Sequence, residues 1–491
     1  MQDWLAARAQ VTPDRIALTV NGEHSNTYEN LYQQAHLRAN AMRSAHPSIK
    51  KGTHVALLGD SEIRTVYTIH ALIHIGAVIV PLNTRLTVEE LTFQVRQAEC
   101  SFVLYDEYRY RETALRLDLP DVSVLSYSEA CTTEKVSSHP QHELRLDDPF
   151  AIIHTSGTSG RPKGAVLTYG NIFYSAMASA YRLGHLPDDR WLCVLPLYHV
   201  GGLSIIMRAV LHGVTVDLHP RFDVDAVNHA LDTQPITLIS LVPTMLRRLL
   251  ESRRRWPDSL RLILLGGAAA PPELLARCRE IGLPVATTYG LTEAASQVAT
   301  MLPDDVNRKP GSVGKPLLFT NVKIIDEHGD SATPGEYGEI VVSGSTVMQG
   351  YYNEPEATAK VLRNGELHTG DMGYLDDDGD LFVVQRRSDL IVSGGENVYP
   401  AEVEQAIRAH PAVVDACVVG LDDEEWGQRV AAAVMVADGA ALTEAELIAF
   451  CRERLAGYKL PRRVLLVEAL PQTASGKVSR AAVRDLFVDN T

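Results

Sequence analysis

The 491-residue sequence predicts an α/β protein of two or more domains, and three observations lead to that prediction. Short apolar runs rich in Val and Ile alternate with helical patterns, which indicates βαβ layers and parallel sheets in a large N-terminal domain. From about Gly311, short strands separated by turn clusters indicate a small, partly antiparallel β-module. Beyond residue 385 a compact α+β pattern begins again, as expected of a small second domain.

The elements of the large domain are expected in a regular order. Val55–Leu58 is typical of a strand, Ile63–Ile75 of a helix and Ala77–Pro81 of the next strand. Further strands are expected at Phe150–Ile153, Ala165–Leu167, Ile236–Leu241, Leu260–Leu265 and Pro284–Thr287. The strands expected in the β-module are Val322–Ile325, Gly338–Val342 and Leu381–Val384.

A polar run from Gln385 to Asp389, between two apolar strands, places the domain boundary near residue 385. The expected domains are therefore residues 1–385 and 386–491. In the second domain, Pro400 opens a helix and Val413–Val419 is a strand. Thr443 followed by Glu446 is a capping-box pattern, which predicts a helix running to about residue 455.

Composition limits the partners of the protein. The chain has 46 basic and 61 acidic residues, a net charge of −15, so no general attraction to nucleic acid is expected. No apolar run approaches the roughly 18 residues of a membrane span, and no secretory signal is visible. The six cysteines contain no C-x-x-C pair, which favours reduced thiols in a cytoplasmic protein over zinc ligands or disulfides. A homo-oligomer would be unsurprising, although nothing in the sequence defines it.

The strongest local motif is His154–Gly164, which lies between two expected strands. Its three glycines allow close backbone approach to a ligand, and its four hydroxyls and Lys163 supply donors for phosphate oxygens. The same composition would suit a flexible polar hairpin loop. It is not a Walker loop, because the lysine is followed by glycine.

This loop resembles the phosphate loop of the adenylate-forming superfamily, which includes acyl-CoA synthetases, luciferases and peptide-synthetase adenylation domains. Five further segments resemble the family's signatures, in the family's order: Thr288–Glu293, His368–Asp371, Arg386–Asp389, Gly394–Pro400 and Pro471–Lys477. The resemblance covers essentially the whole chain. It implies that a carboxylate attacks the α-phosphate of ATP with Mg²⁺ present, releasing pyrophosphate, and that the thiol of coenzyme A then attacks the acyl-adenylate.

The resemblance also implies roles for individual residues. Thr292 would donate to the α-phosphate, Lys477 would bridge that phosphate and the incoming carboxylate, and Glu293 would bind Mg²⁺. From the residues alone, the preferred interpretation of Glu293 is an acid at a helix N-terminus, favoured by the helix dipole. Asp371, expected in a loop, would accept from the ribose hydroxyls together with Arg386. The remaining nucleotide-binding residues implied are Thr155, Ser156, Gly157, Thr158, Ser159, Gly160, Lys163, Gly267, Ala268, Thr288, Tyr289 (its ring near adenine) and Gly290.

Enzymes of this superfamily are thought to rotate a small mobile C-terminal domain between the two steps. The resemblance implies that Lys477 serves adenylation and that the Ser393–Asn397 loop serves thioester formation. A hinge must absorb a large backbone change, and Gln385 is its candidate. Many relatives carry an acidic residue or lysine at that position.

Several segments further resemble the o-succinylbenzoate–CoA ligases of menaquinone synthesis, among them Asp189–Leu203, Ser240–Leu246 and Ile263–Gly267. The implied substrate is an aromatic acid whose second, aliphatic carboxylate is adenylated, with His199 gating or contacting it. No side chain is chosen for the aromatic carboxylate; Arg190, Arg208 and Arg221 are the nearby basic residues. The alternatives are a ligase for another short-chain, medium-chain or aryl acid, a nucleotide-binding protein without catalysis, and an adenylation domain loading a separate carrier protein.

Overall fold

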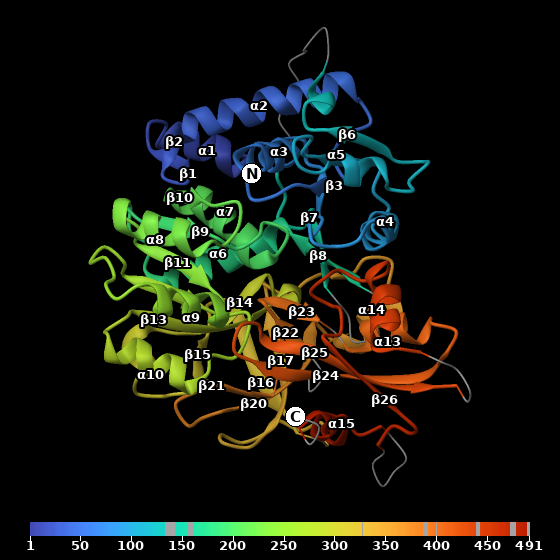
Figure 1. Ribbon diagram of the computed structural model, residues 1–491. Helices are drawn as coiled ribbons and strands as arrows, with labels where there is room; N and C mark the ends of the chain where they lie inside the picture. The colour runs from blue at the N-terminus through green and yellow to red at the C-terminus, as the bar shows by residue number, and fades with distance from the viewer. Residues whose placement is uncertain are drawn as a thin grey trace. The chain divides into compact units, whose positions relative to one another are not determined.

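The computed structural model describes residues 1–132, 143–155, 162–326, 328–385, 391–398, 400–437, 442–471 and 478–488 (Figure 1). The chain divides into two compact units. One consists of Met1–Thr84, Gln94–His154 and Gly164–Gln385, and the other of Arg85–Phe93, Thr155–Lys163 and Arg386–Thr491. The second unit therefore includes two short segments from the N-terminal part of the sequence.

A large sheet of the first unit begins with parallel strands. Its parallel part has the order β1 (Ile16–Val20), β10 (Thr215–Leu218), β9 (Arg190–Cys193), β11 (Leu238–Leu241), β12 (Leu262–Leu265) and β13 (Val285–Leu291). The strand β2 (Glu23–Thr27) pairs antiparallel with β1 at one edge. Leu238–Leu241 and Leu262–Leu265 are buried at every position, as expected for parallel strands covered on both faces.

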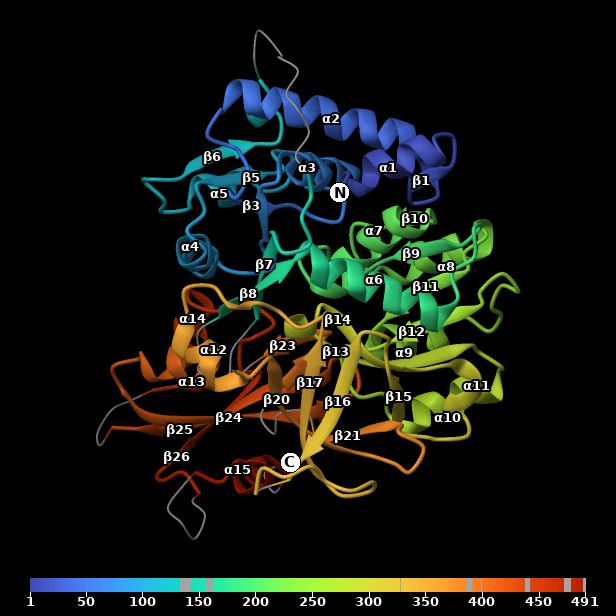
Figure 2. The ribbon, with the colours of Figure 1, turned by 180° about the vertical axis from the view of Figure 1, so that it is seen from behind.

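The same sheet continues as antiparallel strands beyond β13. These are β14 (Ser296–Met301), β15 (Ser312–Pro316), β21 (Leu381–Gln385), β20 (Glu366–Leu375), β17 (Gly338–Gly344) and β16 (Thr320–Ile325), with β19 (Leu362–Arg363) paired to β20 (Figure 2). The strands expected in a small β-module thus exist. They are not a separate sheet, because the β13–β14 hairpin presents an antiparallel edge to β15.

The second sheet of this unit carries the strands on either side of the phosphate-loop motif. Its order is β18 (Gly350–Tyr351), β8 (Lys163–Thr168), β7 (Pro149–Thr155), β4 (Val78–Pro81), β3 (His54–Leu58), β5 (Phe102–Tyr105) and β6 (Ser123–Ser126). The expected βαβ unit is confirmed: α3 spans Ile63–Ile75 between the parallel strands β3 and β4.

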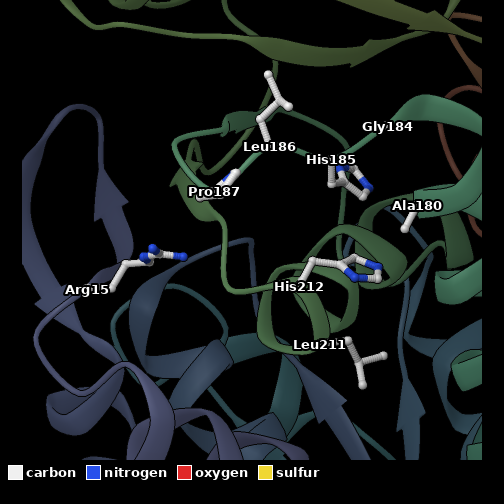
Figure 3. A pocket seen from close by; sticks show the side chains of 8 residues that line it. All are labelled: Arg15, Ala180, Gly184, His185, Leu186, Pro187, Leu211 and His212. Carbon is white, nitrogen blue, oxygen red and sulfur yellow. The ribbon is translucent and has the colours of Figure 1, made fainter.

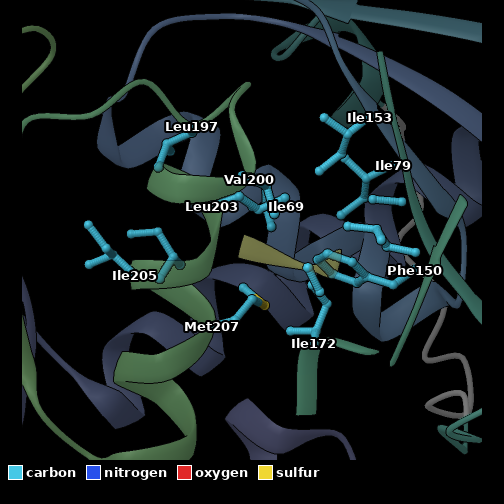
Figure 4. Close-up of a cluster of buried hydrophobic side chains, with 14 of the residues drawn as sticks. Ile69, Ile79, Phe150, Ile153, Ile172, Leu197, Val200, Leu203, Ile205 and Met207 are labelled. Atoms are coloured by element: carbon cyan, nitrogen blue, oxygen red, sulfur yellow. The ribbon is translucent and has the colours of Figure 1, made fainter. Parts of the chain in front are cut away.

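Helices cover these sheets and bury a common core. They are α1 (Trp4–Val11), α2 (Tyr28–Ala45), α3, α4 (Val88–Gln97), α5 (Arg111–Leu115), α6 (Tyr169–Leu183), α7 (Val200–His212), α8 (Val224–Thr233), α9 (Pro243–Ser252), α10 (Pro272–Glu280), α11 (Pro303–Val306) and α12 (Pro355–Val361). Ile69 of α3, Ile79 of β4, Phe150 of β7, Ile172 of α6 and Leu203 of α7 are all buried in one cluster (Figure 4). Helix α7 is therefore held by apolar contacts along its length.

The C-terminal residues form a second α+β arrangement with its own small core. Strands β23 (Glu396–Val398), β22 (Ile391–Ser393), β25 (Gly427–Val436) and β24 (Val413–Asp423) are neighbours, and β26 (Arg463–Val467) pairs parallel with β25. The helices are α13 (Pro400–Arg408), α14 (Glu444–Arg452) and α15 (Arg480–Val488). The capping box at Thr443 and Glu446 is confirmed, but α14 ends at Arg452, before the expected residue 455. No helix among the described residues is long and apolar enough to cross a membrane.

Candidate active site

Several of the site residues expected in the first unit, for substrate, nucleotide or metal ion, follow the carboxyl ends of parallel strands. His199 comes after β9, Gly267 and Ala268 after β12, and Thr292 and Glu293 after β13. Because these strands are parallel and adjacent, their carboxyl ends lie at one edge of the sheet. Ligands of open α/β sheets bind at that edge. The fold therefore brings together residues that are up to 94 positions apart (293 − 199).

The Thr288–Glu293 motif is held in shape by the hairpin of β13 and β14. The Thr288 hydroxyl donates to the carbonyl of Ala299 at 2.9 Å, so this side chain braces the hairpin. A Cβ added at Gly290 would lie 1.8 Å from the carbonyl oxygen of Ser296, so no other residue fits there. The Thr288 hydroxyl is thus engaged within the protein.

Glu293 and Thr292 lie in a 3₁₀ turn directly after β13 (η2, Thr292–Ala294). The Glu293 side chain is buried, and its Oε1 accepts a hydrogen bond from the hydroxyl of Tyr351 at 2.8 Å. Its Oε2 accepts no hydrogen bond from the part of the chain that the structure describes, nor does the Thr292 hydroxyl have a partner there. Two oxygen atoms therefore remain available for a metal ion and a phosphate.

Asp371 is not in a loop, as the sequence suggested, but in the middle of β20. The glycine before it does not mark a turn: Gly370 has φ +71° within the strand, where it disturbs the pairing without ending it. Asp371 is buried and accepts a hydrogen bond from the Tyr289 hydroxyl at 2.6 Å. The structure thus joins two of the nucleotide-binding residues that the sequence proposed.

His199 is the N-cap residue of α7 and is half-buried. Its ring packs edge-on against the ring of Tyr198, with the centroids 4.8 Å apart. Gly267 has φ +80°, a conformation that favours glycine, and Ala268 follows it as a small, half-buried residue. Both are small residues, as expected of a backbone wall beside a ligand.

Part of the predicted site lies outside the described residues. Arg386 and Lys477 fall there, as do the loop residues Ser156, Gly157, Thr158, Ser159 and Gly160. The two ends of that loop are described: Thr155 closes β7 and Lys163 opens β8. Gln385, the hinge candidate, is the last residue of β21.

A cluster of three aspartates is the one group of metal-ligand type among the described residues. Asp376, Asp378 and Asp380 bring oxygens within 4.8 Å of one another in the turn between β20 and β21. The Lys309 ammonium binds all three carboxylates, at 2.6, 2.7 and 2.6 Å. The cluster therefore already holds a protein cation, which offsets part of its negative charge.

A cavity of about 390 Å³ is lined in part by Leu211 and His212 (Figure 3). These residues end α7, whereas His199 precedes its first turn. The cavity contains none of the predicted site residues, and the rings of His185 and His212 stack in it with centroids 4.9 Å apart. Burial lowers the pKa of His212 to about 4 and also lowers that of His185. Both imidazoles are neutral near pH 7, so they offer little charge to a phosphate.

Arg208 of α7 is one of the three basic residues among which the sequence alone makes no choice. Its side chain is only 2% exposed, and its Nε and Nη2 atoms have no hydrogen-bond partner among the described residues. Burial lowers its pKa to about 10, so the guanidinium still carries its charge at neutral pH. Its charged group lies over the ring of Trp191 at 5.9 Å. A buried cation without an anionic partner is costly, and only the fold reveals that this arginine is one.

Two family models match the chain. The model described as AMP-binding enzyme covers residues 5–352, and the one described as AMP-binding enzyme C-terminal domain covers residues 402–477. The chain belongs to the AMP-binding enzyme family. This establishes the superfamily that the six motifs resembled, including the α/β fold of a large domain followed by a small one.

The relatives of this AMP-binding enzyme share nearly its full length. The 2-succinylbenzoate–CoA ligase of Bacillus cereus is 43% identical over 99% of this chain and 98% of its own. An o-succinylbenzoate CoA synthetase double mutant from Bacillus subtilis, bound with a product analogue, is 40% identical with a TM-score of 0.93, covering 99% of this chain and 98% of that one. The Bacillus subtilis enzyme in complex with ATP and magnesium ion is 40% identical with a TM-score of 0.75, covering 99% and 100%.

Proposed function

We propose that this AMP-binding enzyme is a 2-succinylbenzoate–CoA ligase of menaquinone biosynthesis. It is an AMP-forming acid–thiol ligase, with ATP, Mg²⁺ and coenzyme A as the reaction partners. The observation that carries the proposal is the 43% identity over 99% of the chain with ligases of this one activity. The free state of all six cysteines fits a cytoplasmic location, where thiols stay reduced.

The first step brings two anions together, the substrate carboxylate and the α-phosphate of ATP. Positive charge and oriented donors must neutralise the charge that develops in that transition state. We assign the Thr292 hydroxyl to the α-phosphate and Lys477 to the oxygens of both reactants. Asp371 and Arg386 would hold the ribose hydroxyls, and the loop ending at Lys163 would hold the β- and γ-phosphates.

Glu293 fits the Mg²⁺ that the reaction requires. Magnesium prefers hard oxygen ligands, and the Oε2 atom of this buried carboxylate has no partner among the described residues. Bound there with the nucleotide, the ion would neutralise phosphate charge. The aspartate cluster around Lys309 is not needed for this role, because it already holds an ammonium.

The substrate has a second carboxylate on its aromatic ring, and we assign that group to Arg208. The arginine lies on the helix that begins after His199, it is charged, and it has no carboxylate partner among the described residues. A carboxylate at this guanidinium would complete a buried ion pair. His199, at the start of the same helix, would contact the acyl group.

A panel of acids tests the activity and the role of Arg208 together. Pyrophosphate release and CoA-thioester formation are measured with 2-succinylbenzoate and with 4-oxo-4-phenylbutanoate, which lacks the ring carboxylate. If another acid, and not 2-succinylbenzoate, gives CoA-dependent turnover, the chain is a ligase for a different short-chain, medium-chain or aryl acid.

Arg208→Met should lower kcat/KM for 2-succinylbenzoate by at least about 100-fold, as expected for breaking a buried ion pair. The analogue should be affected only a few-fold. Arg190→Met is the matched control, because Arg190 is already engaged by Thr19 at 2.8 Å and Asp217 at 3.7 Å. An equal loss with both acids would refute the assignment of Arg208.

A further inference from the structure

We infer that Tyr351 is a positioning residue, which fixes the orientation of the Glu293 carboxylate so that one of its oxygens faces the metal ion. The inference rests on the metal-binding role proposed for Glu293. It comes from a contact between two residues 58 positions apart that the motifs do not link.

The hydrogen bond between the two side chains is buried at both ends. The Tyr351 hydroxyl donates to Oε1 of Glu293 at 2.8 Å, and the residues are 7% and 6% exposed. With Oε1 engaged, Oε2 is the oxygen that has no partner among the described residues. The two oxygens of the carboxylate therefore have different roles: one is held by the phenol, and the other is left for a ligand.

The backbone around Tyr351 makes this donor rigid. Tyr351 is in β18, where it is paired antiparallel with Ala165 of β8, and its ring belongs to the main apolar core. Three residues earlier, the Met348 N–H donates to the carbonyl oxygen of Glu293 at 2.9 Å. The short stretch from Met348 to Tyr351 therefore holds both the backbone and the side chain of Glu293.

The chemistry of a neutral donor suits this task. A lysine or arginine in the same place would neutralise Glu293 and weaken its attraction for a cation, whereas a phenol orients the carboxylate and leaves its charge intact. Groups that orient a metal ligand in this way commonly change metal affinity by about 10-fold to 100-fold when they are removed.

The test is the affinity of the full-length protein for Mn²⁺, measured by electron paramagnetic resonance with α,β-methylene-ATP bound. Tyr351→Phe keeps the ring in the core and removes only the donor, so the Mn²⁺ affinity should fall about 10-fold. In turnover, the Mg²⁺ concentration for half-maximal pyrophosphate release should rise about as much, with kcat at saturating Mg²⁺ changed less.

Tyr352→Phe is the matched control. The neighbouring phenol also donates to a carboxylate, Oε2 of Glu99 at 2.8 Å, but at the surface. It should leave Mn²⁺ affinity unchanged. An unchanged affinity in Tyr351→Phe, or an equal loss in Tyr352→Phe, would overturn the inference.

The variant Glu293→Gln, alone and combined with Tyr351→Phe, distinguishes a failure of the inference from a failure of the proposed metal-binding role. If Tyr351 acts through Glu293, the double variant binds Mn²⁺ no more weakly than Glu293→Gln alone. If the losses of Mn²⁺ affinity in the two single variants add in the double variant, Tyr351 does not act through Glu293. The inference then fails, but the assignment of Glu293 as a metal ligand is unaffected. If Glu293→Gln binds Mn²⁺ as tightly as wild type, Glu293 is not a metal ligand. The inference about Tyr351 then fails together with that part of the proposed function.

Discussion

At the scale of single residues, the two carboxylates proposed to serve the nucleotide have one feature in common: each accepts a hydrogen bond from a tyrosine hydroxyl. Asp371 accepts from the Tyr289 hydroxyl at 2.6 Å and Glu293 from the Tyr351 hydroxyl at 2.8 Å, and all four residues are buried. A buried carboxylate needs hydrogen-bond donors to offset its lost hydration. Because the donors are neutral, the carboxylates keep their charge and a fixed orientation toward their ligands.

Tyr289→Phe tests the first of these pairs. Without the phenol, Asp371 should be less firmly oriented toward the ribose hydroxyls, and KM for ATP should rise about 10-fold to 100-fold, since a hydrogen bond to a charged group contributes about 1.5–3 kcal/mol. The measurement is pyrophosphate release at varied ATP with saturating acid.

The ribose itself provides the control for that experiment. With 2′,3′-dideoxy-ATP there are no hydroxyls for Asp371 to accept from, so wild type and Tyr289→Phe should differ little in KM. A similar rise in KM with both nucleotides would mean that Tyr289 supports the adenine or the fold rather than Asp371.

The sequence could predict the residue types of the site but not these pairings. Glu293, Thr292 and Asp371 lie in recognisable motifs, so their chemistry could be proposed directly. Tyr289 and Asp371 are 82 positions apart, and only the register of the strands brings them together. Arg208 could not be chosen among the nearby arginines, because a sequence does not show that a buried cation lacks a partner.

Among the helices, the start of α6 shows how one cap can support a distant segment. Thr168 and Asn171 form a capping box, and the Asn171 amide nitrogen also donates to the carbonyls of Ser345 and Val347 at 2.9 and 2.8 Å. These residues immediately precede Met348, which binds the backbone of Glu293. The cap therefore connects a helix terminus to the metal-ligand candidate.

Asn171→Ala should consequently destabilise the protein more than loss of an ordinary cap. The substitution removes the cap and leaves two carbonyls without their donor. We expect the free energy of unfolding, measured with urea, to fall by about 3 kcal/mol. Thr27→Ala, which removes the exposed N-cap bond of α2, is the control and should cost about 1 kcal/mol. Equal costs would show that the bonds to residues 345 and 347 add nothing.

Elements could be predicted from local patterns where hydrophobic periodicity was clear. Helix α3 has the predicted bounds, and the expected parallel strands agree within a few residues because each is a short buried apolar run. The joining of the antiparallel strands to the large sheet could not be predicted, since it depends on which edge the β13–β14 hairpin leaves open. The loop predicted at Asp371 was wrong for a related reason. Gly370 has a left-handed φ, but it adopts that conformation within a strand.

At the scale of the whole molecule, buried histidines make stability depend on pH. Burial lowers the pKa of His154 to about 3 and of His70 and His212 to about 4, against about 6.5 in an unfolded chain. Between about pH 6.5 and 4.5 the unfolded chain binds these protons and the native protein does not, so stability falls as the pH falls. Each histidine contributes a slope of up to about 1.4 kcal/mol per pH unit.

Urea unfolding at pH 7.0, 6.0 and 5.0 measures that slope. His70→Gln should reduce the slope by up to about 1.4 kcal/mol per pH unit, because the glutamine amide does not titrate. His24→Asn, at an exposed position with φ +48°, should leave it unchanged. A slope that is the same in all three proteins would remove the buried histidines as its cause.

The two half-reactions are proposed to depend on different parts of the second unit, which contains both Lys477 and the Ser393–Asn397 loop. If Lys477 serves adenylation alone, Lys477→Ala should slow pyrophosphate release by at least about 100-fold, since an oriented cation at the developing charge is worth several kcal/mol. It should still form the thioester from a synthetic acyl-adenylate and coenzyme A at a rate within a few-fold of wild type.

The loop Ser393–Asn397 should show the opposite behaviour if it serves the thioester step. Gly395 has φ +83°, so Gly395→Ala strains the loop and should slow thioester formation while leaving pyrophosphate release largely intact. Rapid-quench measurement of each half-reaction decides between the models. A single shared chemical centre predicts that each variant slows both steps together, whereas a small domain that presents two surfaces in turn predicts the crossed pattern. The hinge at Gln385 is required only in the second case.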